Sequence, residues 1–257
     1  MNRIITTLFT FLLIQLLVVN KTFGDEAEVK DCFEKLNRVT FALNMGLDKV
    51  IFKPISKGYR KLPSPIRTGT GNALNNLSNL ITIPNNILQG DFGSAGNNSA
   101  RLIINTTLGI AGIFDPANSF GFAKREKEDF GQSLGVMGVG EGCYLVLPVL
   151  GPSTVRDTVG SLISMNGGDI WHNITVRDDE EYVKEFKESD YWVSRVTSGL
   201  DFRAKNLEAF DAMEKSSVDL YATVRSLYLQ DRKKKINNSN SKTEAMDDGD
   251  WDTLENQ

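Results

Sequence analysis

The sequence predicts a mainly α-helical protein built as a single domain. Apolar residues recur at three- and four-residue steps in two stretches, residues 74–88 and 207–228, as they do on one face of a helix. No segment of strand length stands out with the apolar–polar alternation of a half-buried strand. No repeat period and no linker divides the 257 residues into parts.

Composition excludes several classes of protein. With 40% apolar residues the chain is long enough to bury a core, so it is neither wholly disordered nor collagen-like. One histidine and two cysteines are too few for most zinc architectures, and we expect no metal site and no cofactor. A net charge of −4 offers no basic surface for nucleic acid.

Residues 1–24 have the pattern of a cleaved secretory signal. Arg3 supplies the positive start, residues 4–19 form an apolar run, and Gly24 ends a stretch with small residues before the cut. The apolar run is shorter than the roughly 20 residues that a spanning helix needs. We therefore expect export from the cytoplasm and a mature domain over residues 25–234.

Charge is unevenly spread along the mature chain. Residues 68–176 hold 13 charged residues in 109, whereas residues 177–257 hold 32 in 81. Ionised side chains hydrate well, so a water-facing surface normally carries them throughout. The charge-poor region is therefore expected to face lipid or another protein, or else to be the core of a larger body. It has no run of 18 apolar residues that would predict transmembrane helices.

An amide-rich stretch over residues 72–90 predicts an amphipathic helix or a pair of helices. Asn72 is a candidate N-cap after a turn at Gly69 and Gly71, and Pro84 is expected to kink or break the helix. A neutral polar face lets a helix lie in a membrane interface, although an ordinary hairpin of Asn-rich helices is the alternative. The apolar residues expected at the interface are Leu74, Leu77, Leu80, Ile81, Ile87 and Leu88.

A glycine cluster precedes the best candidate for a strand. The glycines do not form the G-x-G-x-x-G motif of dinucleotide-binding folds, and they indicate tight turns or close backbone approach. Residues 144–150 could form a short strand, but Pro148 lies inside them and argues against it. The glycines concerned are Gly135, Gly138, Gly140 and Gly142.

In the C-terminal third, residues 200–233 predict a long amphipathic helix that faces water on one side. Its apolar stripe runs from Leu207 to Tyr228 with charged residues between, and one break near residues 216–219 fits the pattern. Plain structural packing explains this stripe well. Residues 235–257 are polar and acidic, which predicts a disordered tail.

Catalysis has little support in the residues. His172 is the single imidazole and is more readily explained as a structural histidine than as a base. No G-x-S-x-G elbow is present, and no isolated carboxylate pair stands in an apolar setting. Arg156 and Asp157 follow an apolar run and are expected to form a buried or half-buried ion pair. We therefore predict no catalytic residues.

Cys32 and Cys143 are the two thiols of the chain. An exported chain meets an oxidising compartment, where a bridge can form. Spacing alone leaves open whether their Cα atoms come within the roughly 4.4–6.8 Å that a disulfide requires. No cysteine follows the signal directly, and Cys32 is a poor candidate for lipidation.

Short motifs follow one another along residues 31–234. They are residues 33–38 (FEKLNR), 54–60 (PISKGYR), 85–90 (NNILQG), 101–109 (RLIINTTLG), 129–135 (DFGQSLG), 144–148 (YLVLP), 151–157 (GPSTVRD) and 225–230 (RSLYLQ). Each segment is weak by itself, and the specificity comes from their order. In this order they resemble the VacJ/MlaA family of bacterial outer-membrane lipid-asymmetry proteins.

The resemblance implies a single-domain helical ring in the inner leaflet of the outer membrane, with a central amphipathic channel. It also implies a non-enzymatic activity, in which phospholipid misplaced in the outer leaflet passes through the ring toward a periplasmic lipid carrier. An outer-membrane porin trimer is the implied membrane partner. The channel is expected near the glycine cluster, at Gly135, Gly138, Gly140, Gly142, Tyr144 and Pro148.

The chain departs from the family at its cysteines. Members usually begin with a lipidated cysteine, which is not suitably placed here, so we expect retention at the membrane without a lipid. Cys32 and Cys143 both stand where the family commonly has proline, which makes a bridge between them a sharper expectation. Two other functions remain open, a soluble periplasmic hydrolase and a structural porin-associated protein without lipid passage.

Overall fold

The computed structural model describes residues 29–177 and 186–237, and the expected signal and most of the expected tail lie outside them. Three short π-helical turns, Asp48–Phe52, Ser164–Gly168 and Asn173–Arg177, join some of the helices. The helices and strands are α2 Glu34–Leu47, α3 Lys53–Arg60, α4 Ser64–Leu88, α5 Phe92–Thr107, α6 Pro116–Ser119, α7 Phe130–Val136, β1 Tyr144–Leu147, β2 Gly151–Thr154, α8 Val155–Ile163, α9 Ile170–His172, α10 Glu188–Lys205, α11 Leu207–Ser216 and α12 Leu220–Ile236.

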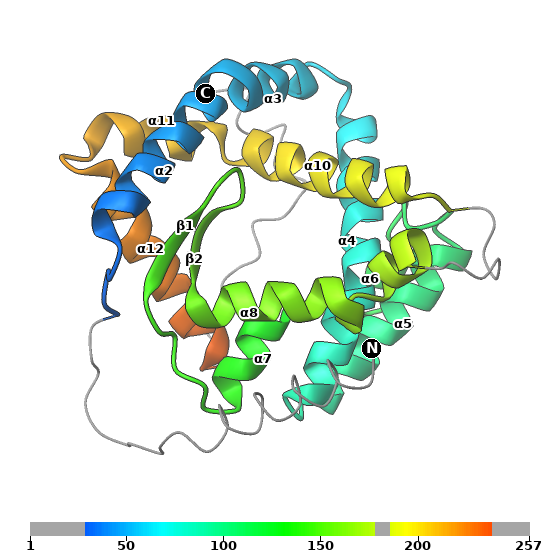
Figure 1. Ribbon diagram of the computed structural model, residues 1–257. Coiled ribbons are helices and arrows are strands. Elements are labelled where there is room, and N and C mark those ends of the chain that lie inside the picture. The colour runs from blue at the N-terminus through cyan, green and yellow to red at the C-terminus, as the bar shows by residue number, and fades with distance from the viewer. Residues whose placement is uncertain (1–28, 178–185, 238–257) are drawn as a thin grey trace.

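The helices run round a ring, which confirms the mainly α-helical prediction (Figure 1). In that view α2 and α3 form the upper side, α4 the right side, α8 the lower side, and the β1–β2 hairpin with α12 the left side. Helix α10 packs against α3 and α4, and α5 packs against α4. Helix α2 contacts β1, and α12 contacts β2 and α7, so the two ends of the described part of the chain close the ring.

Helix α4 is longer and less interrupted than the sequence predicts. It begins at Ser64, directly after Pro63, so Asn72 is inside the helix and is not its N-cap. Gly69 and Gly71 are buried helical residues; a Cβ on Gly69 would lie 3.0 Å from Ile113. Pro84 also lies within the helix and does not break it. The expectation of a turn before residue 72 and of a break at Pro84 is therefore wrong.

The candidate strand forms, although it is shorter than residues 144–150. β1 pairs antiparallel with β2, with Tyr144 opposite Thr154 and Leu147 opposite Gly151. Pro148 ends β1 and lies in the connecting turn, where Val149 has a left-handed backbone with φ 66°. Because proline cannot donate to the ladder, it marks the end of this strand and does not prevent it.

The long C-terminal helix of the prediction is three helices. The break near residues 216–219 is present, because Asp219 accepts from the Ala222 backbone N–H at 3.2 Å and starts α12. A second break, at Asn206, separates α10 from α11 and was not predicted. Helix α12 continues to Ile236, so residues 235 and 236 belong to the fold and not to the tail.

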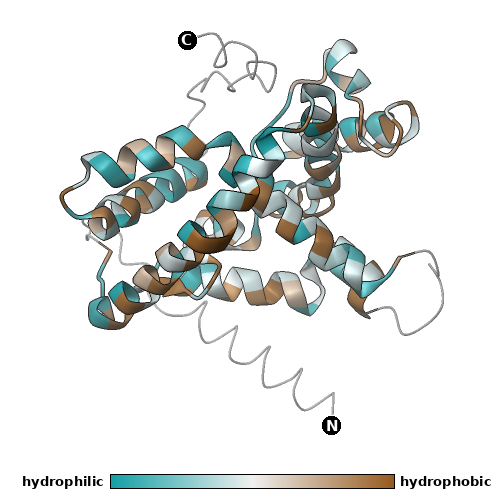
Figure 2. Cartoon of the chain, turned by 90° about the horizontal axis from the view of Figure 1, so that it is seen from above, coloured by the Kyte–Doolittle hydropathy of each residue, from teal (hydrophilic) through white to brown (hydrophobic). Residues whose placement is uncertain are grey.

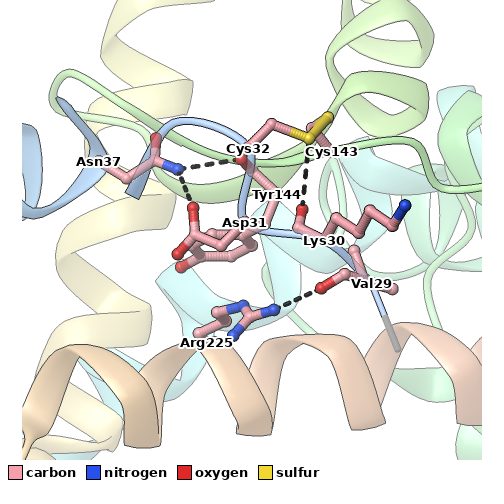
Figure 3. The surroundings of a disulfide bond; sticks show 8 residues. All are labelled: Val29, Lys30, Asp31, Cys32, Asn37, Cys143, Tyr144 and Arg225. Atoms are coloured by element: carbon pink, nitrogen blue, oxygen red, sulfur yellow. Dashed lines mark hydrogen bonds between the residues drawn. A yellow bond between two sulfur atoms is a disulfide. The ribbon is translucent and has the colours of Figure 1, made fainter. Parts of the chain in front are cut away.

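A small aromatic core joins the two ends of the chain to the hairpin. Tyr144 of β1 and Tyr221 of α12 are buried with ring centroids 6.0 Å apart and nearly perpendicular planes. A disulfide joins Cys32 to Cys143, the residue before β1, with Cα atoms 5.6 Å apart (Figure 3). The N-terminal segment is thereby tied covalently to the hairpin.

The helices carry bands of both hydrophobic and hydrophilic residues (Figure 2). Within residues 29–177 and 186–237, no helix combines the length and the hydropathy that crossing a bilayer requires.

Candidate functional site

The pattern of burial is inverted relative to an ordinary water-soluble protein. Among the residues that the structure describes, eight apolar side chains are buried against twenty-two polar or charged ones. On α4, Asn85 and Thr82 are fully enclosed while Ile87 and Leu88 are 50% and 46% exposed. Globular proteins in water show the opposite preference. The packing between the helices is thus largely polar, and many large apolar side chains are exposed.

Three asparagines of α4, Asn76, Asn85 and Asn86, are among these buried polar residues. Asn86 Oδ1 accepts from Asn98 Nδ2 of α5 at 2.9 Å, and Asn85 Oδ1 accepts from the Ser133 hydroxyl of α7 at 2.6 Å. The amides therefore face neighbouring helices, which corrects the expectation of a neutral amide face turned to the surroundings. Burial requires hydrogen-bonding partners for such groups, and α5 and α7 supply them.

The six apolar residues expected at a membrane interface lie on α4 at different depths. Ile87 and Leu88, at its C-terminal end, are exposed, and the other four are half-buried. The half-buried four are Leu74, Leu77, Leu80 and Ile81.

The residues expected to line a channel do not share one environment. Gly135 lies in α7, where a Cβ would come within 2.7 Å of Ile236 in α12. Gly138, Gly140 and Gly142 are exposed, and φ values of 90° at Gly138 and 69° at Gly142 explain why glycine stands at these two turns. Pro148 is exposed at the tip of the hairpin.

Tyr144 has a structural role in place of the expected channel position. Its ring is fully buried, and burial raises the pKa of its hydroxyl to about 12. Asn37 of α2 holds β1 along one edge. It donates to the Tyr144 carbonyl at 3.0 Å and accepts from the Val146 N–H at 2.9 Å. A residue enclosed in this way cannot offer its ring to a passing lipid, so Tyr144 is removed from the channel set.

A charged network joins α12 to α7 and α8. Arg232 donates to Asp129 at 2.6 and 2.9 Å and to Asp157 at 2.8 Å, and the Tyr228 hydroxyl donates to Asp157 at 2.5 Å. Burial alone would raise the pKa of both carboxyl groups, but Arg232 holds the pKa of Asp129 at about 2 and that of Asp157 below its usual range. Arg156 also pairs with Asp157, at 3.1 Å, which confirms the predicted buried ion pair.

A polar cavity of about 90 Å³ lies where α4 and α5 meet the loop before α7. Four asparagines of α4 line it, Asn72, Asn75, Asn76 and Asn79. From α5 come Asn98, Arg101 and Asn105, and from the loop come Lys124, Arg125, Glu126 and Lys127.

Beside this cavity the loop buries a carboxyl group. Glu128 accepts from Gln89 Nε2 at 2.9 Å, and its backbone N–H donates to the Thr82 hydroxyl at 3.4 Å. Burial raises the pKa of Glu128 to about 7, because Gln89 offsets only part of the lost hydration. The charged run at residues 124–129 is thus exposed up to Lys127 and buried at Glu128.

His172, the single imidazole of the chain, packs edge-on against Tyr191, with ring centroids 4.9 Å apart. No group of three or more metal-ligating side chains occurs in the described part of the chain.

Sequence reasoning missed the residues that build the polar interior. A usable signal was present, since Asn72, Asn76 and Asn79 on α4 recur at the three- and four-residue steps of one helix face. Asn98, Arg101 and Asn105 do the same on α5. Two such stripes on consecutive helices indicate a shared polar interface. The partners of Arg232, by contrast, lie 75 and 103 residues away in the sequence, so local spacing cannot indicate them.

Comparison with known proteins gives a consistent result. The family model described as MlaA lipoprotein matches residues 29–235. An uncharacterized protein of Rickettsia prowazekii is 34% identical over 200 residues, covering 77% of this chain and 75% of that one. The intermembrane phospholipid transport system lipoprotein MlaA of Escherichia coli is 31% identical over 211 residues, covering 80% and 78%. A solved structure, described as the structural basis for maintenance of bacterial outer membrane lipid asymmetry, has a TM-score of 0.67 at 29% identity and covers 80% of this chain and 99% of its own.

Proposed function

This chain belongs to the MlaA lipoprotein family, and on that premise we propose that it is a phospholipid-transfer component of the bacterial outer membrane. In this role it removes phospholipid misplaced in the outer leaflet and passes it toward the periplasm, which maintains the asymmetry of the membrane. The relatives with a named function are intermembrane phospholipid transport lipoproteins.

The inverted burial is the observation that carries this proposal. Leu108 and Ile110, after α5, and Val39 and Leu43, on α2, are each more than half exposed, so apolar side chains cover widely separated parts of the ring. Such a surface is costly in water and favourable against hydrocarbon, at roughly 25 cal/mol per Å².

We propose further that lipid passes through the centre of the ring, beside the hairpin. Gly138, Gly140, Gly142 and Pro148 are exposed around the hairpin, and their small or rigid backbone permits close approach of a ligand. The hairpin tip is held by Asn44, which donates to the Leu147 carbonyl at 2.9 Å and accepts from the Val149 N–H at 2.7 Å. The α4 residues with exposed apolar side chains, Ile87 and Leu88, are proposed to contact the membrane interface.

The proposed partners are an outer-membrane porin trimer and a periplasmic lipid carrier. The exposed apolar ring surface suits the first, and the charged C-terminal helices suit the second.

We propose that the protein sits at the periplasmic face of the outer membrane and is held there by its apolar surface. Both cysteines of the chain are joined to each other, so neither Cys32 nor Cys143 has a thiol available for a lipid. Intact-mass measurement without reductant tests this. The mass should fall two hydrogens below that of the dithiol form and carry no acyl chains, whereas free thiols or added acyl mass would contradict it.

The proposed activity involves no bond making. A soluble hydrolase would need a positioned nucleophile or acid–base pair, and the relatives are transport proteins. The second candidate, a structural partner of porins, shares the apolar surface and differs in lacking lipid passage.

A complementation experiment separates these candidates. The full chain is expressed in a bacterium that lacks its own family member, and outer-leaflet phospholipid is measured through the products of an outer-membrane phospholipase. Restored low levels, relative to an empty vector, are expected from a transfer protein. Persistent outer-leaflet phospholipid, together with purified protein that carries no phospholipid in lipid-phosphorus analysis, would contradict the proposal.

A further inference from the structure

The cavity between α4, α5 and the loop at residues 124–127 is lined entirely by polar side chains. Pockets for drug-sized organic ligands are mostly apolar with a few polar groups, so this one is built for a different ligand. Its volume of about 90 Å³ admits a small polar group and not an entire lipid.

The charges around the cavity favour an anion. Arg101, Lys124, Arg125 and Lys127 line it against two acidic residues, Asp115 and Glu126, a net of 4 − 2 = +2. Asp115 is already engaged, since Arg101 donates to it at 2.7 Å and Asn105 at 2.9 Å. The remaining acidic group, Glu126, is exposed at the loop surface.

Asn76 is the second, independent sign of a ligand. It is only 6% exposed, and its Oδ1 atom has no hydrogen-bond partner, although buried amides nearly always have one. Its Nδ2 atom donates to the Thr106 hydroxyl at 2.9 Å. A hydroxyl can donate or accept, so the amide can be reversed without loss of this bond. Asn76, which lines the cavity, thus has one amide position without a protein partner.

From the polar lining, the net positive charge, the small volume and the unpaired amide of Asn76, we propose that this cavity binds a phosphate ester. Carboxamide donors hold the phosphate oxygens, and the cations of the loop balance the charge. Given the proposed function, on which the source of the group rests, the phosphate belongs to a phospholipid head group. The site would recognise what all glycerophospholipids share and leave the head-group alcohol outside.

Titration calorimetry on the full chain in a mild non-ionic detergent tests the site. The probes are dihexanoyl phosphatidylglycerol and, separately, inorganic phosphate. We expect the lipid to bind and Asn79→Asp and Arg125→Gln each to weaken its binding at least tenfold, since the first adds a repelling carboxylate and the second removes a cation. Lys35→Gln, an exposed residue of α2, removes the same charge away from the cavity and should leave binding unchanged.

Asn79→Leu tests whether a loss of binding is caused by misfolding, because leucine has nearly the shape of asparagine without its hydrogen bonds. It should melt like the parent protein and still lose lipid binding. Binding of inorganic phosphate alone would overturn the lipid assignment, and equal binding by all variants would overturn the site. Parent protein that purifies without phospholipid and fails the complementation experiment would instead contradict the proposed function.

Discussion

Among single residues, buried amides fill the packing between elements, where an ordinary core has apolar side chains. Asn37 of α2 bonds one edge of β1, and Asn86 binds Asn98 across the α4–α5 interface. A buried polar group that loses its partner costs roughly 1–3 kcal/mol, so these pairs also make the packing specific. Residues of this kind are hard to identify from sequence, since an asparagine on a helix is usually at the surface.

Arg232 is the single side chain whose loss should matter most to the closed ring. Arg232→Gln leaves the buried Asp157 short of its main counter-charge, and we expect a loss of about 3–5 kcal/mol in the free energy of unfolding. Lys235→Gln, which breaks an exposed pair with Asp231 on the same helix, should cost about 0.5 kcal/mol or less. Chemical denaturation of both variants measures the difference. Equal losses would show that the network adds nothing beyond surface pairing.

Glu128 should make stability depend on pH near neutrality. Burial raises its pKa from 4.5 to about 7 in the folded protein, so its contribution is full below about pH 4.5 and is lost as the pH rises through 7. Glu128→Gln keeps the shape and can still accept from Gln89. We expect the variant to melt several degrees above the parent protein at pH 8 and close to it at pH 5. A difference that does not change with pH would contradict the raised pKa.

At the scale of elements, periodicity predicted the helices better than their ends. Pro84 removes one backbone donor, at about 3 kcal/mol, but α4 continues because Asn85 and Asn86 are anchored on α7 and α5. Asn85 Nδ2 also donates to the Ile81 carbonyl at 2.8 Å within the same turn. Tertiary contacts of this kind override local signals and cannot be read from one sequence.

The contact between α7 and α8 depends on glycine. A Cβ on Gly160 would come within 2.3 Å of the Gly131 backbone nitrogen, which cannot move aside as a side chain can. Gly160→Ala should therefore destabilise the protein by about 1–3 kcal/mol or more. Gly199→Ala, in the interior of α10 with nothing within 4 Å, should raise stability by roughly 0.5–1 kcal/mol. Thermal melts that shift in the same direction for both variants would contradict the close packing of α7 on α8.

At the scale of the whole molecule, the scarcity of charge over residues 68–176 did indicate unusual surroundings. The scarcity of charge does not show which side of the ring is apolar, because that depends on which helices pack together. The composition predicts amides at the membrane interface and apolar residues in the packing between helices. In the structure, α4 instead buries Asn85 and exposes Ile87. Family resemblance predicted the ring, and the lipid surroundings that the scarcity of charge indicates stay a prediction.

The apolar exterior leads to a prediction about membrane binding. Ile87 and Ile103 are 50% and 64% exposed on α4 and α5, so aspartate at both positions can be accommodated without burying charge inside the fold. Each aspartate at bilayer depth costs roughly 2.5–3.5 kcal/mol by insertion scales. We expect the double variant Ile87→Asp, Ile103→Asp to lose most of its flotation with vesicles of phosphatidylethanolamine and phosphatidylglycerol. The control adds the same two charges to exposed positions of α11, Ala209→Asp and Ala212→Asp, and should float like the parent protein. Equal flotation of all three proteins would mean that water, and not hydrocarbon, covers α4 and α5, and the inverted burial would then need another cause.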